Sequence, residues 1–202
     1  MNIPNSVNIL GTEYKIILKD KNDSVFSDGC DMGFVPDTKE IFMTMEGLNS
    51  AEKELMFTAC IIRAFLFESG ILEERMQCDY DIDIPFTTAK FFLKIQNMIR
   101  KFDKKKENLT KVNILGTKYR ISYFNRNYFT DYDSCIISLD KKIMININKS
   151  ESYIRESIVY ELFNAFVLEM GLDYAWICDS YLPDWFMIQF TKIEKVVNML
   201  KQ

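Results

Sequence analysis

The chain contains no histidine, and this absence excludes more chemistry than any other feature of its composition. Histidine is the commonest metal ligand in proteins and the usual acid–base group near neutral pH. Its absence rules out Ser-His-Asp and Cys-His catalysis. It also leaves any zinc site with cysteines and carboxylates as its ligands.

The cysteines form neither a metal-binding nor a disulfide pattern. They are Cys30, Cys60, Cys78, Cys135 and Cys178. Their number is odd and no two form a C-x-x-C pair, which predicts free thiols in a reducing compartment. We interpret Cys60 as a buried core thiol rather than a nucleophile. The start of the chain shows no basic region followed by an apolar run, and no apolar stretch reaches about 18 residues. We therefore expect a cytoplasmic protein without a signal peptide or a membrane span.

Glycine and proline are also scarce, with 7 and 4 residues, which argues against a loop-dominated or fibrous protein. Of the 202 residues, 48% are apolar, and 16 Phe and 10 Tyr supply bulky core material. This composition is sufficient for a folded core. The formal net charge of −4 disfavours a broad nucleic-acid-binding surface, because that surface needs clustered Lys and Arg.

One segment occurs twice. Residues 7–15 read VNILGTEYK, and residues 112–120 read VNILGTKYR. Further matches along the chain join residues 39–43 to 141–145 and residues 64–71 to 165–172. The repeat predicts a tandem duplication, with a first domain at residues 1–103, a charged linker at 104–111 and a second domain at 112–202.

Each copy predicts the same order of elements: a β-rich opening, a second strand, a helix and a closing helix. These are residues 8–18 and 113–124, then 40–45 and 142–147, and the closing helices 87–102 and 184–201. Asn49 or Ser50 is expected to cap the first long helix, and Ser150 or Ser152 the second. Gly70 and Gly171 stand where a helix is expected to end. The fold class is therefore α+β, with two repeats of a small antiparallel sheet plus two helices.

Three motifs together carry a resemblance to a known family. They are the opening VNILGTEY, the A-F-x-x-E-x-G pattern at residues 64–70 and 165–171, and DWFMIQF at residues 184–190. With these motifs the chain resembles short phage and prophage proteins that have a zincin-like, minimal metallopeptidase domain. The helix of that family carries H-E-x-x-H before A-F-x-x-E-x-G. The resemblance implies two histidines that bind one zinc ion and a glutamate that takes the proton from the zinc-bound water.

The corresponding positions of this chain have lost the histidines. They are Ala59, Cys60 and Arg63 in the first copy and Tyr160, Glu161 and Asn164 in the second. The charge of Arg63 would repel a metal ion, and Tyr160 and Asn164 are weak ligands at neutral pH. Glu161 retains the residue type of the general base, and we expect it to pair with Arg155 or Lys192 or to be solvated. We predict a pseudoenzyme without metal, cofactor or catalysis.

Several segments alternate carboxylates with aromatic residues. The candidate partner-binding residues are Asp28, Asp31, Asp79, Tyr80, Asp81, Asp83, Asp131, Tyr132, Asp133, Trp176 and Asp179. They are either solvated loops or a contact surface for a basic groove, whereas Trp185 is expected to pack in the core.

The working hypothesis is a non-catalytic, protein-binding inhibitor of phage or mobile-element origin. It would block a host defence system, for instance as an anti-CRISPR protein that occupies the nucleic-acid groove of a nuclease, without binding nucleic acid itself. The alternatives are a residual hydrolase that uses Glu161 and a phage structural or accessory protein.

Overall fold

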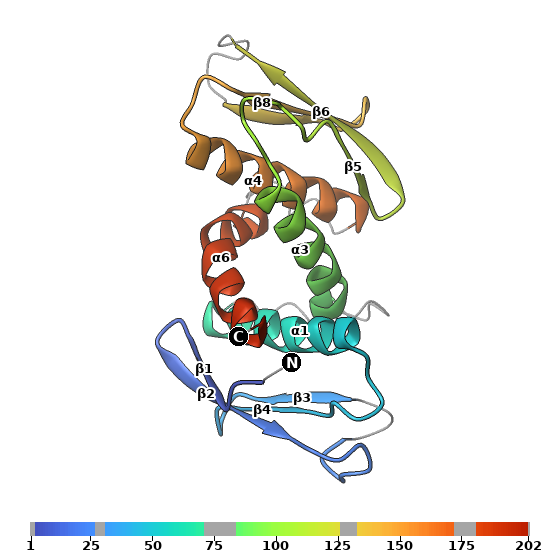
Figure 1. Cartoon of the computed structure of the whole chain (residues 1–202), viewed down its shortest axis with the longest axis vertical. Helices are drawn as coiled ribbons and strands as arrows, with labels where there is room; N and C mark the ends of the chain where they lie inside the picture. The colour runs from blue at the N-terminus through green and yellow to red at the C-terminus, as the bar shows by residue number, and fades with distance from the viewer. Residues whose placement is uncertain (1–2, 27–30, 71–83, 126–132, 172–180, 202) are drawn as a thin grey trace. The chain divides into compact units, whose positions relative to one another are not determined.

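The structure is a computed structural model that describes residues 3–26, 31–70, 84–125, 133–171 and 181–201 (Figure 1). In this part of the chain there are two four-stranded sheets, and each is followed by two α-helices. The α+β class and its tandem sheet-plus-helices repeats are therefore confirmed.

The two repeats have the same order of elements. The first contains β1 (Ser6–Ile9), β2 (Thr12–Leu18), β3 (Met32–Val35), β4 (Glu40–Met43), α1 (Ser50–Glu68) and α3 (Ile84–Arg100). The second contains β5 (Lys111–Ile114), β6 (Thr117–Phe124), β7 (Ser134–Ile137), β8 (Lys142–Asn146), α4 (Glu151–Glu169) and α6 (Tyr181–Val197), and it ends in the 3₁₀ helix η1 (Asn198–Lys201).

Each sheet is mixed, so the prediction of antiparallel sheets was wrong in this respect. The strand orders are β1-β2-β4-β3 and β5-β6-β8-β7. The central pairs β2–β4 and β6–β8 are parallel, and the outer pairs are antiparallel. The prediction missed β3 and β7, the edge strands from which the chain turns back into the centre of each sheet. Both are four residues long and partly exposed throughout, so they lack the alternation of buried and exposed residues that marks a strand in a sequence.

The repeated N-I-L-G-T motif forms the tight turn between the first two strands of each sheet. Leu10 and Gly11 both have left-handed backbone conformations, with φ of 51° and 98°, as a type I′ turn requires. The Asn8 side chain accepts a hydrogen bond of 3.1 Å from the backbone N–H of Gly11. In the second copy Asn113 accepts the same bond from Gly116, at 3.0 Å. The motif is thus a structural signature of the hairpin.

The helix ends follow the sequence expectations. Asn49 caps α1 and forms a reciprocal capping box with Glu52, and Ser150 caps α4. Gly70 and Gly171 follow the carboxyl ends of these helices with φ of 71° and 64°.

A long helix covers one face of each sheet, α1 in the first repeat and α4 in the second (Figure 1). Phe163 of α4 stacks on Phe186 of α6, with 4.0 Å between the ring centroids. Trp185 meets the same Phe186 ring edge to face. Trp185 is 5% exposed, which confirms its expected place in the core.

The chain divides into two compact units. Unit 1 is Met1–Leu93 together with Lys192–Gln202, and unit 2 is Lys94–Thr191. Both divisions fall inside a closing helix, so α3 begins in unit 1 and ends in unit 2, whereas α6 begins in unit 2 and ends in unit 1. Among the helices that the structure describes, none combines the length and the apolar character that crossing a bilayer requires.

Candidate functional site

The motif positions of the first repeat offer poor metal ligands. Ala59 and Cys60 are buried in α1, and Arg63 is exposed. The Sγ atom of Cys60 lies 3.4 Å from the Sδ atom of Met32 in β3. Cys60 is therefore the buried core thiol that its sequence context predicts. The chemistry of this donor set does not fit a zinc ion.

In the second repeat Glu161 is buried, with 2% of its surface exposed. The Ser134 hydroxyl donates a hydrogen bond of 2.7 Å to its Oε1 atom, while Oε2 has no hydrogen-bond partner in the described structure. The expectation that Glu161 is solvated or paired with Arg155 or Lys192 was wrong, because Glu161 lies on the face of α4 that packs against β7. Arg155 instead binds the Glu151 carboxylate and the backbone carbonyl groups of Ile99 and Phe102.

Burial raises the pKa of Glu161 to about 7, because the charged form loses its hydration. The Ser134 hydroxyl and, more weakly, the Asn164 amide oppose part of this rise. Near neutral pH the Glu161 carboxyl is therefore present in both protonation states.

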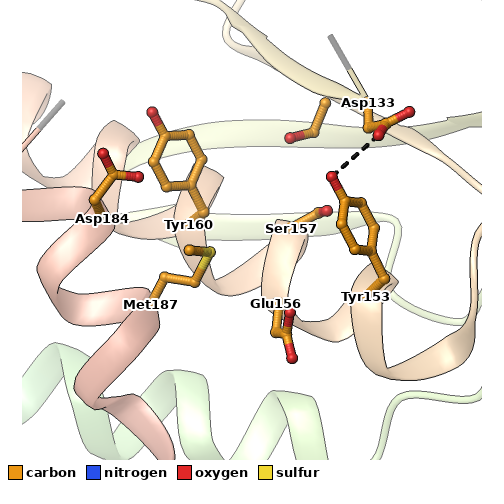
Figure 2. A pocket seen from close by; sticks show the side chains of 8 residues that line it. Asp133, Tyr153, Glu156, Ser157, Tyr160, Asp184 and Met187 are labelled. Carbon is orange, nitrogen blue, oxygen red and sulfur yellow. Dashed lines mark hydrogen bonds between the residues drawn. The ribbon is translucent and has the colours of Figure 1, made fainter.

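A polar pocket of about 330 Å³ lies beside this buried carboxyl, within unit 2 (Figure 2). Its lining residues are Asp133, Ser134, Tyr153, Glu156, Ser157, Tyr160, Asp184 and Met187. Figure 2 shows Asp184 of α6 beside Tyr160 of α4 at one end, and the Tyr153 hydroxyl directed at Asp133 at the other. We call this site the unit 2 pocket.

Asp133 is the predicted partner-binding residue that the structure places in this pocket. Its carboxylate accepts hydrogen bonds from Tyr153 at 3.0 Å and Asn146 at 3.2 Å, and it forms an ion pair of 2.9 Å with Lys149. The hydrogen bond from Lys149 is the main cause that lowers the pKa of Asp133. Asp31, which precedes β3, is half-buried at the corresponding place of the first repeat. The other candidates lie outside the described residues: Asp28, Asp79, Tyr80, Asp81, Asp83, Asp131, Tyr132, Trp176 and Asp179.

The glutamate of the A-F-x-x-E-x-G motif is the centre of a hydrogen-bond cluster that occurs in both repeats. Glu68 accepts hydrogen bonds from Thr12 at 2.9 Å, from Tyr14 and from Lys39 at 3.2 Å. Glu169 accepts the equivalent bonds from Thr117, Tyr119 and Lys141. Sequence reasoning missed this cluster, although all four residue types recur at matched positions. The motif glutamate therefore joins the carboxyl end of the long helix to the sheet.

Sequence reasoning also missed Ser134, Tyr153, Glu156 and Asp184 as lining residues of one pocket. A comparison of the two repeats contains the signal. The positions of Ser134 and Glu161 are occupied in the first repeat by Met32 and Cys60. A polar pair therefore stands where the other copy of the same fold has a pair of sulfur side chains.

Within the described residues, no three His, Cys, Asp or Glu side chains come close enough together to hold a metal ion. The residues of the second motif, Tyr160, Glu161 and Asn164, fit a zinc ion no better than those of the first. The chain matches no known protein family, no characterised protein and no solved structure.

Proposed function

We propose that the protein works by binding a partner, on a scaffold of metallopeptidase ancestry that has lost its metal chemistry. The observation that carries this proposal is the donor set of the two motif helices. In α1, Ala59 and the exposed Arg63 replace the two expected ligands, and the buried thiol of Cys60 replaces the expected general base. In α4 the carboxyl group of Glu161 is bonded to Ser134.

The partner is a protein with a basic surface, and the nucleic-acid groove of a host defence nuclease is one such surface. The net charge of −4 and the carboxylates of the unit 2 pocket support this class of partner. The phage or mobile-element origin and the inhibitory role rest on the family resemblance. Such a complex weakens as salt rises, and chelators leave it unchanged.

Zinc binding by the full chain tests the proposal. The positive control is the double variant Tyr160→His with Asn164→His, which restores H-E-x-x-H around Glu161. We expect isothermal titration calorimetry to detect zinc binding at least about tenfold tighter for this variant than for the natural chain, because two imidazoles one helical turn apart bind one ion. Equally tight stoichiometric zinc in the natural chain, with peptidase activity that Glu161→Gln abolishes, would overturn the proposal.

A residual hydrolase is the second candidate, and one observation favours it. The Ser134 hydroxyl lies 2.7 Å from a carboxyl group whose pKa is raised to about 7, beside a pocket. A base of this pKa suits proton transfer near neutral pH. Against it, the pocket lining contains three carboxylates, which disfavour the oxyanion of acyl transfer. Labelling of Ser134 by a fluorophosphonate, lost in Glu161→Gln, would support this candidate; absence of labelling supports a binder.

A further inference from the structure

We infer that the unit 2 pocket receives the guanidinium group of an arginine side chain on the partner protein. This inference rests on the proposed function, and it adds the place and the chemistry of the contact. Of the pocket's eight lining residues, three are carboxylates and none is a lysine or an arginine.

The negative charge of the pocket is incompletely balanced. Asp133 is paired with Lys149. Glu156 and Asp184, by contrast, have no ion pair in the part of the chain that the structure describes. Glu156 is exposed and Asp184 is half-buried, so both carboxylates can be reached from solvent. A positively charged ligand is therefore favoured.

Two of the lining hydroxyl groups already donate a hydrogen bond to a carboxyl group. The Ser134 hydroxyl donates to Glu161 at 2.7 Å, and the Tyr153 hydroxyl donates to Asp133 at 3.0 Å. Each hydroxyl oxygen then presents lone pairs to the pocket. Together with the carboxylates of Glu156 and Asp184, these oxygens make a lining rich in acceptors. Guanidinium has five N–H donors and no acceptor, so it is the side-chain group that complements this lining best.

The buried Glu161 carboxyl adjoins the pocket through Ser134, which lines the pocket and donates to Glu161. Its Oε2 atom has no hydrogen-bond partner in the described structure, although only 2% of the residue's surface is exposed to solvent. An unsatisfied buried oxygen costs free energy and calls for an explanation. A cation bound at Ser134 would favour the ionised form of the Glu161 carboxyl, whose Oε1 atom accepts the Ser134 hydrogen bond.

The size and the aromatic residues of the pocket select arginine over lysine. About 330 Å³ is at the lower end of ligand-pocket volumes and suits one side chain. Tyr160 supplies a phenol ring, against which a planar, weakly hydrated guanidinium packs better than an ammonium group. The Tyr153 ring already has the Lys149 ammonium 5.5 Å from its centroid. The ligand is an arginine within a polypeptide, because the proposed partner is a protein.

The first repeat is an internal comparison for this site. Where α4 has Glu156, Ser157 and Tyr160, α1 has Leu55, Met56 and Ala59. The same fold therefore forms without the polar lining, and the lining is a property of the second repeat. A binding role accounts for this difference, because the packing of the repeat does not require it.

The test is a titration of the full, isotope-labelled chain with N-acetyl-arginine methylamide, followed by amide chemical shifts at pH 7.5 and low salt. The matched neutral probe is N-acetyl-citrulline methylamide. We expect saturable shifts that are confined to the lining residues, and at least tenfold weaker binding of the citrulline probe. The double variant Glu156→Gln with Asp184→Asn should weaken binding of the arginine probe at least tenfold.

The control variant, Asp37→Asn with Asp140→Asn, removes the same number of charges from exposed turns outside the pocket and should change the affinity less than twofold. Ser134→Met, which copies Met32 of the first repeat, is a second test in case the double variant does not fold. It should also abolish the amide shifts that the arginine probe causes. Non-saturating shifts over the whole surface, or equal weakening by the control variant, would overturn the inference. Failure to bind the probe, without zinc binding or peptidase activity, refutes this inference alone; stoichiometric zinc with activity refutes the proposed function itself.

Discussion

The buried carboxyl of Glu161 should make the stability of the protein depend on pH between about pH 5 and 8, where the protein has no histidine to titrate. The folded-state pKa is about 7, against 4.5 for an unperturbed glutamate. The stabilising contribution is complete below 4.5 and is lost as pH rises towards 7, because the unfolded chain ionises more easily than the folded one. With one pKa unit worth about 1.4 kcal/mol, the difference amounts to about 3 kcal/mol.

The absence of histidine removes the side chain that most often titrates in this pH range, so it cannot mask the effect of Glu161. Among the described residues, the other shifted carboxyl groups have lowered pKa values, and the shifted Tyr, Cys and Lys groups have raised ones. Those groups titrate below or above the window between pH 5 and 8. A change of stability within that window that is absent from Glu161→Gln can therefore be assigned to Glu161.

Urea unfolding of the natural chain at pH 5, 6, 7 and 8 measures the effect, and Glu161→Gln is the variant that removes it. We expect the free energy of unfolding of the natural chain to fall by about 2–3 kcal/mol from pH 5 to 8, while that of Glu161→Gln stays nearly constant. The pair of changes Ser134→Met and Glu161→Cys, which copies the first repeat, should also be insensitive to pH. A natural chain whose stability varies by less than about 1 kcal/mol, in parallel with the glutamine variant, would refute this account of Glu161.

Three further predictions follow from the packing and the backbone. Glu169→Gln weakens the charged hydrogen bond with Lys141, and because that pair is partly exposed to solvent it should cost up to about 1 kcal/mol at neutral pH. This deficit should shrink as pH falls from 4.5 towards 2, because the pKa of Glu169 is lowered to about 2, chiefly by Lys141. Phe186→Ala removes the ring stacked on Phe163 and should cost about 3–5 kcal/mol in urea unfolding. Leu115→Asn should stabilise the hairpin by about 1 kcal/mol, because Leu115 has a left-handed φ of 46° that asparagine adopts more easily.

Each of these predictions has its own control. Lys141→Gln should reproduce most of the loss in Glu169→Gln, and a loss that persists unchanged at pH 2 would contradict the ion-pair explanation. Ile188→Ala, at a 57% exposed position of α6, should cost much less than Phe186→Ala. Leu115→Ala should give little gain in melting temperature, since alanine also has a Cβ; a loss of stability in Leu115→Asn would show that the leucine side chain itself matters.

The sequence alone determined the duplication, the fold class, the long helices and their caps. These features depend on identities, periodicity and the residues at helix ends, which are local properties of the chain. The replacement of both histidines in both motif helices was likewise evident from the residues. The hairpin motif could be found by self-comparison, although its hydrogen bonds could not.

The tertiary structure decided the features that depend on residues far apart in the chain. It showed that β4 lies parallel to β2. The sequence could not predict this pairing, because the intervening edge strand β3 lacks a recognisable strand pattern. It buried Glu161 against Ser134, whereas the sequence predicted a solvated or ion-paired carboxylate. It also paired Asp133 with Lys149 and brought Asp184 of α6 beside the α4 residues of one pocket. Burial and hydrogen bonding determine the protonation state and the accessibility of these groups. Burial and hydrogen bonding arise only when the chain folds, so the sequence alone does not reveal them.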